Sequence, residues 1–218
     1  MTLTRTAQTD ALRQEFDRQV ENLIHRGYPA LAGLTEGALL GHLEPLRDRL
    51  TALDAVPADL DAPRLPLVLV IAGDVVPSSE SITHTEMRGR PGFTTMEPDD
   101  LARFAPTSDV EAPAGPAYLL VDVDTGADTL DVVPDDALGT ITRVNRSPLT
   151  VEEGIAVVTH HPEVLRTHNC FSLLGSRCGD RRVPALWVSK GRPRLGWCWA
   201  GAPHTWLGSA SAGGRVGV

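Results

Sequence analysis

The chain has 218 residues, of which 42% are hydrophobic and 22% charged, and its formal net charge is −8. A chain of this length can bury a core without disulfide or metal support, and its composition excludes a disordered protein, a collagen-like fibre and a coiled coil. No apolar run approaches the roughly 18 residues of a membrane-spanning helix, and the first residues lack the apolar part of a secretory signal. The three cysteines, an odd number, favour reduced thiols. We therefore expect a cytoplasmic protein with no membrane partner.

The charge is distributed unevenly along the chain. Residues 1–165 carry 27 acidic and 12 basic side chains, a balance of −15, whereas residues 166–218 carry 1 acidic and 8 basic side chains, a balance of +7. Such asymmetry indicates either a C-terminal region that binds anions or two segments that neutralise each other within one fold. Mutual neutralisation needs no ligand, so we expect residues 1–218 to form a single domain.

Two amphipathic segments open the chain. Apolar residues recur at three- and four-residue spacing over residues 12–24 and 39–53, which predicts a helical hairpin within residues 1–55. Pro45 implies either a kink in the second helix or a start near residue 44. Residues 56–66 are rich in Pro, Ala and Asp, which predicts a linker or surface loop.

The middle of the chain alternates strand and helix signals. Apolar runs at residues 67–72 and 117–123 predict buried strands, and shorter strands are expected near residues 81–87 and 92–96. Three helix starts follow from N-terminal signals, namely Pro98, Pro134 and a capping box formed by Thr150 with Glu153.

The C-terminal part has the pattern of an antiparallel meander. Short apolar segments alternate with Gly and Pro turns, and strands are expected near residues 171–174, 185–189, 195–199 and 204–207. All four tryptophans (187, 197, 199 and 206) lie in this part, and we expect most of them to be core. The predicted fold is α+β, with the helical hairpin packed on a mixed or antiparallel sheet that ends in this Trp-rich meander.

Asp124 begins an Asp-Thr-Gly turn after an apolar strand. This sequence resembles the catalytic turn of retroviral-type aspartic proteases, in which two such aspartates share a proton and activate water. However, Asp122 stands where that family packs an apolar side chain. The same stretch also partly matches the phosphatase signature of the haloacid-dehalogenase family, but its residues stand in a different order. It partly matches a calcium-binding loop as well, but it lacks the glutamate that ends such a loop. A strand followed by an acidic turn is the simplest interpretation.

Cys178 is the candidate nucleophile of a thiol enzyme. Neighbouring arginines in the string GSRCGDRR would lower its pKa, and His168 or His204 would act as base with Asp180 as the orienting acid. The best candidates for zinc ligands are His168, Cys170 and Cys178. Their spacing contains no two-ligand clip such as Cys-x-x-Cys, so we expect no metal and no cofactor.

Arginines and tryptophans interleave in the same region. Arg177, Arg181, Arg182 and Trp187 are therefore the predicted ligand-binding residues, because basic and aromatic side chains together suit an anion. The acidic remainder of the chain disfavours nucleic acid. We expect a module that binds a small anionic ligand or a protein partner, and the alternative is a hydrolase that uses Cys178 or Asp124. The pattern leaves the oligomeric state open.

The long C-terminal string FSLLGSRCGDRRVPALWVSKGRPRLGWCWAGAPHTWLGSAS, with YLLVDVDTG and SPLTVEEGIAVVTHHPEVL before it, carries one further resemblance. It resembles an uncharacterised family of actinobacterial proteins with a domain of unknown function. The resemblance implies a cytoplasmic, bacterial, single-module protein, and it assigns no role to any residue.

Overall fold

A computed structural model describes residues 5–53 and 64–218, and it has the expected α+β class. The helices are α1 (Arg5–His25), α2 (Tyr28–Leu31), α3 (Glu36–Arg49), α4 (Ser78–His84), α5 (Pro98–Ala102), α6 (Pro134–Arg143) and α7 (Val151–His160), with the 3-10 turns η1 (Leu50–Ala52), η2 (Ala127–Thr129) and η3 (Pro162–Val164). The longer strands are β1 (Arg64–Ile71), β6 (Ala117–Asp124), β10 (Arg182–Ser189), β11 (Arg192–Trp199) and β13 (Ser211–Val216). The shorter strands are β2 (Glu86–Met87), β3 (Arg90–Pro91), β4 (Phe93–Thr94), β5 (Ala105–Pro106), β7 (Ser147–Pro148), β8 (Cys170–Ser172), β9 (Ser176–Arg177) and β12 (Leu207–Ser209). None of the helices in these ranges is long and apolar enough to cross a membrane.

The strands form two main sheets instead of the single sheet that was predicted. The first sheet has the order β1-β6-β13-β7 and is antiparallel throughout. The second has the order β12-β8-β10-β11-β4 and is mixed, because β12 pairs with β8 and β4 pairs with β11 in parallel. The predicted meander was therefore right for β8, β10 and β11 and wrong for the last strand, which crosses to the far side of β8.

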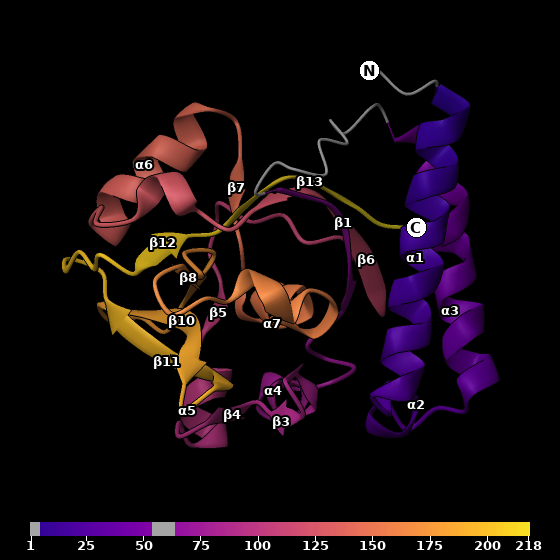
Figure 1. The fold of residues 1–218 in the computed structure, drawn as a ribbon, viewed down its shortest axis with the longest axis horizontal. Helices are drawn as coiled ribbons and strands as arrows, with labels where there is room; N and C mark the ends of the chain where they lie inside the picture. Colours follow the sequence, from indigo (N-terminus) through magenta and orange to yellow (C-terminus); the bar gives the residue numbers. More distant parts are fainter. Residues whose placement is uncertain (1–4, 54–63) are drawn as a thin grey trace.

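The elements lie in layers (Figure 1). The hairpin of α1 and α3 covers one face of the first sheet, α7 lies against its other face, and the second sheet lies beyond α7. This arrangement explains the uninterrupted apolar sequence of β1. Leu67, Leu69 and Ile71 pack against the hairpin, whereas Val68 and Val70 face α7. A strand that is buried on both faces has no solvent side, so it shows no polar alternation.

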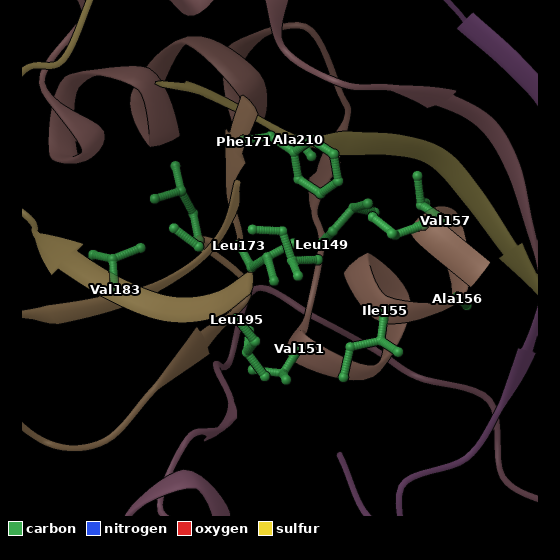
Figure 2. Packing of buried hydrophobic residues seen from close by; sticks show 14 of the residues in the cluster. Leu149, Val151, Ile155, Ala156, Val157, Phe171, Leu173, Val183, Leu195 and Ala210 are labelled. Atoms are coloured by element: carbon green, nitrogen blue, oxygen red, sulfur yellow. The ribbon is translucent and has the colours of Figure 1, made fainter. Parts of the chain in front are cut away.

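The central helix α7 starts at the predicted capping box. The Thr150 hydroxyl accepts a hydrogen bond from the Glu153 N–H, and the Glu153 carboxylate accepts one from the Thr150 N–H at 2.8 Å. Figure 2 shows Val151 of α7 beside Leu195 of the second sheet, and Ile155 lies near Leu69 and Ile71 of the first sheet. Within Val151–His160, only Glu152 is not fully buried.

The capping glutamate Glu153 also carries a buried ion pair. Its carboxylate receives two hydrogen bonds from Arg215 on β13, at 2.6 and 2.8 Å, and one from the Tyr118 hydroxyl at 3.0 Å. The Glu153 side chain is fully buried and the Arg215 side chain is 6% exposed. Helix α7 is thereby tied to two strands of the first sheet.

Polar side chains cover the outer edge of β1. The Gln19 amide donates to the Leu67 carbonyl at 2.9 Å and accepts from the Leu69 N–H at 2.7 Å, as a neighbouring strand would. His160 Nε2 lies 3.0 Å from the Leu69 carbonyl, and its Nδ1 lies 3.2 Å from the Asn22 amide nitrogen. A neutral ring that donates from Nε2 and accepts at Nδ1 satisfies both contacts. Burial lowers the pKa of His160 to about 3.

Three local predictions need correction, and one strand was not predicted. Residues 81–87 were expected as a strand, but most of them belong to helix α4, because Pro77 precedes a short run that can form helical turns. Helix α3 begins at Glu36 after the Thr35 cap and not near residue 44. The predicted linker 56–66 lies mostly outside the described residues, and its last part, from Arg64, belongs to β1. Strand β13 was not predicted, because its small residues give no apolar pattern.

Candidate functional site

Arg182, at the start of β10, already has carboxylate partners. Its guanidinium donates two hydrogen bonds to Asp100, at 2.7 and 3.0 Å, and its Nε donates to Asp180 at 2.9 Å. The Arg182 guanidinium holds the pKa of Asp100 below its ordinary value. The Arg182 N–H and the Cys178 thiol lower the pKa of Asp180 to about 2. These contacts tie α5 to the second sheet, as the expected neutralisation between the two chain segments requires.

Arg177 and Arg181 differ in their surroundings. The Arg177 guanidinium lies 3.6 Å from the Asp135 carboxylate, burial lowers its pKa, and its Nη1 has no hydrogen-bond partner among the described residues. Arg181 is exposed, its guanidinium lies over Gly201, and its side chain has no ion pair within the described part of the chain. Of the three predicted arginines, Arg181 is thus the one available to a partner.

Trp187 is not brought together with these arginines. It lies five positions from Arg182 on the same strand, so the two side chains leave opposite faces of the sheet. Trp187 packs edge-on against Trp206 at a centroid distance of 6.2 Å, and the Arg194 guanidinium lies 5.1 Å from its ring. It is a half-buried packing residue of the opposite face.

Trp197 and Trp199 are the exposed tryptophans, contrary to the prediction that most tryptophans are core. Their side chains are 38% and 51% exposed, and their rings meet edge-on with centroids 5.2 Å apart. The Arg182 guanidinium lies 5.7 Å from the Trp197 ring. Cys198, between them, is buried. We call the surface formed by Arg182, Trp197 and Trp199, with Arg181 against Gly201 two residues beyond Trp199, the tryptophan surface.

The predicted thiol enzyme does not assemble. The Cys178 thiol donates to the Asp180 carboxylate at 3.1 Å, and burial together with this hydrogen bond raises its pKa, the opposite of the expected thiolate. His168 is exposed, and His204 packs against Trp206 with ring centroids 5.4 Å apart. The described residues show no contact between Cys178 and either histidine. This geometry gives the hydrolase alternative no support.

Asp124 closes a turn. Its carboxylate accepts a hydrogen bond from the Gly126 N–H at 2.7 Å and lies 3.6 Å from Arg64. The carboxylate at 122 is likewise paired, with Arg146 and Arg64. These contacts are those of a strand followed by an acidic turn, with its charge neutralised by arginines.

The weak zinc candidates are also separate. Cys170 donates its thiol hydrogen to the Arg166 carbonyl at 3.1 Å, and Cys178 is engaged with Asp180. In the described ranges, no three His, Cys, Asp or Glu side chains are grouped so as to hold a metal ion. All three cysteines are free thiols.

A family model described as a family of unknown function (DUF5701) matches residues 22–218. The chain belongs to this family. The match covers the tryptophan surface, α7 and both sheets, and it begins within α1. Searches of curated proteins and of solved structures found no significant match.

Sequence reasoning missed two features of this family member. Trp197 and Trp199 were noticed as aromatic residues, but their exposure depends on what covers the end of β11. Glu152 was not singled out, although it lines a groove together with Val151 at the start of α7. The sequence shows the residue types in both cases, but it does not show that these side chains are exposed or that they line a groove.

Proposed function

We propose that this protein is a binding module that docks a protein partner through the tryptophan surface. The observation that carries the proposal is a pair of adjacent, exposed tryptophans. Arg181, which has no ion pair among the described residues, lies against Gly201, two residues beyond Trp199. Tryptophan and arginine are the residue types that most often dominate the binding energy of protein interfaces. Two rings that already pack against each other also lose little side-chain freedom on binding.

A protein partner fits better than a small anion. A small anion needs free guanidinium groups, whereas Arg182 is engaged by Asp100 and Asp180, and Arg177 lies beside Asp135. Such an anion would have to compete with carboxylates that are part of the fold. A partner that buries the two tryptophans and pairs with Arg181 leaves these internal ion pairs intact.

The two exposed rings and Arg181 indicate the chemistry of the partner. Arg177, Arg182 and Arg215 are paired with carboxylates of the fold, whereas Arg181 lies against Gly201, two residues beyond Trp199, and has no ion pair among the described residues. An apolar segment flanked by Asp or Glu complements both features, with the apolar part on the rings and a carboxylate on Arg181. We accordingly propose an acidic-apolar segment of another protein as the occupant.

Peptide display tests the proposal with a defined probe. Random peptides are selected on the wild-type protein, and their binding is then measured with the Trp197→Ser/Trp199→Ser variant and with Leu40→Ser, which changes an exposed apolar residue of α3. We expect selected peptides to carry carboxylates next to apolar residues and to lose at least about tenfold in affinity for the double variant only. Arg181→Glu should reverse the charge preference.

Four outcomes would overturn this function. Selected peptides that bind the double variant as well as the wild type would place recognition elsewhere, and a selection without enrichment would remove the evidence for peptide binding. A dimer in native mass spectrometry that dissociates in the double variant would make a second copy of the chain the occupant instead. A co-purified anion lost in Arg181→Glu would restore the small-ligand alternative.

A bacterial, specifically actinobacterial, origin and a cytoplasmic location belong to the same proposal. They are supported by the resemblance of the C-terminal string and by the three free cysteines, which suit a reducing compartment. Fractionation of cells that express the natural protein, followed by detection with an antibody, would test the location.

A further inference from the structure

A groove lies at the start of α7, away from the tryptophan surface. It has two adjoining hollows, of about 190 and 250 Å³, which share Gly73 and Glu152. The first is bounded by the starts of α4 and α5, and the second by the loop that precedes β6. Figure 1 shows α4 and α5 together beside one end of α7. Segments far apart in the sequence therefore converge on one carboxylate.

Glu152 and Glu153 differ sharply although they are neighbours. The Glu153 carboxylate is neutralised by Arg215, whereas the Glu152 carboxylate has no cation within ion-pair distance among the described residues. Glu152 is also half-buried, and burial raises its pKa above the ordinary value. A carboxylate that is partly removed from water without a counter-ion is costly for the fold. A positively charged ligand would relieve that cost.

Gly73 is required for the position of this carboxylate. A Cβ atom at residue 73 would lie 2.7 Å from Glu152 Oε1 and 2.9 Å from its Cγ. The Glu152 side chain thus lies directly against the backbone that follows β1. Any side chain at residue 73 would displace the carboxylate from the point where the two hollows meet.

The lining of the groove combines apolar walls with the uncharged polar side chains Ser78, Ser79, Tyr118 and Thr150, and it carries no positive charge. Asp74 is the only other ionisable carboxylate in the two linings, and neither lining contains Lys, Arg or His. Most of the walls are formed by proline and other apolar side chains, namely Pro77, Pro98, Leu101, Phe104, Pro106 and Pro113. Apolar walls with one converging charge are typical of small-molecule sites.

We propose that this groove binds a small organic cation, with its ammonium group at the Glu152 carboxylate and its apolar body between the proline walls. The apolar walls and the absence of a metal-holding group among the described residues favour an organic cation over a metal ion. The ammonium supplies the charge that Glu152 lacks, and Asp74 adds a second negative charge at the mouth.

Nuclear magnetic resonance titration with three probes of one shape tests this site. Benzylammonium, benzyl alcohol and benzoate share a ring and differ in charge. We expect benzylammonium to shift the amide resonances of Gly73, Asp74 and Glu152, benzyl alcohol to bind at least about tenfold more weakly, and benzoate to leave them unchanged. Equal effects of the three probes, or benzylammonium shifts located elsewhere, would overturn the proposal.

Variants separate the carboxylate from general effects on the fold. Glu152→Gln should remove the advantage of benzylammonium over benzyl alcohol, and Gly73→Ala should weaken benzylammonium binding because it moves the carboxylate while keeping its charge. Glu80→Gln, on the exposed side of α4, should bind as the wild type does. If Glu152→Gln retains the preference for the cation, the site is refuted. Trp197→Ser/Trp199→Ser should bind benzylammonium normally, so this site and the proposed docking function fail independently.

Discussion

The buried pair of Glu153 and Arg215 allows a quantitative prediction. In an Arg215→Met variant, the Glu153 carboxylate keeps its hydrogen bonds from Tyr118 and the Thr150 N–H, but it loses two short bonds and its only counter-charge among the described residues. The Ser147 hydroxyl and the Pro148 carbonyl lose an Arg215 donor as well. Breaking a buried pair by removing one partner costs about 3–5 kcal/mol.

Urea unfolding monitored by tryptophan fluorescence and by circular dichroism measures this cost. For a chain of this length, a loss of about 3–5 kcal/mol corresponds to a fall in Tm of roughly 6–20 °C. The matched control is Arg64→Met, because Arg64 is 45% exposed and also pairs with aspartates. An exposed pair contributes at most about 1 kcal/mol.

A double variant separates the uncompensated charge from the lost packing. Glu153→Gln/Arg215→Met removes both charges, so its unfolding free energy should lie above that of Arg215→Met. The reasoning is refuted if Arg215→Met and Arg64→Met lose the same stability, or if the double variant is no more stable than Arg215→Met alone.

Three further predictions concern buried groups. In the unfolded chain His160 has its ordinary pKa of 6.5, whereas burial lowers the pKa of His160 to about 3 in the folded chain. The unfolded chain therefore binds more protons between these values, and the free energy of unfolding should fall by up to about 1.4 kcal/mol per pH unit as the pH drops from 6 to 4.5. His160→Gln should show a shallower fall in urea titrations over this range, and an identical slope would contradict the prediction. Gly154→Ala should destabilise the protein by about 1–3 kcal/mol, although alanine normally favours a helix, because its Cβ would overlap the Leu173 side chain. A variant that is stabilised in thermal unfolding would contradict this prediction. Cys178 should react with iodoacetamide at neutral pH much more slowly in the folded than in the urea-unfolded protein, since its pKa is raised, and rapid labelling of the folded protein would show a thiolate.

The candidate sites show where local reasoning stopped. The tryptophans and arginines of the C-terminal part were recognised by type. Trp187 and Arg182 nevertheless leave opposite faces of one strand, because β10 begins at Arg182, three residues before the predicted strand. Arg182 was predicted as a ligand-binding residue, yet Asp100 reaches it from helix α5, 82 positions earlier in the chain. No spacing rule relates two segments whose proximity arises only when the second sheet closes on α5.

Local patterns in the amino-acid sequence determined the α+β class, the helical hairpin, the buried strands β1 and β6 and the capping box of α7, because each depends on propensity and periodicity within a few residues. The tertiary structure decided the division into two sheets, the pairing of β13 with β6 and the partners of the charged residues. Strand β13 has small residues and no apolar alternation, so its conformation follows from the hydrogen bonds that β6 and β7 offer it. Glu152 and Glu153 illustrate the same limit. They are adjacent and chemically identical, but Arg215 from β13 neutralises one, while the other faces a groove, and only long-range packing distinguishes the two.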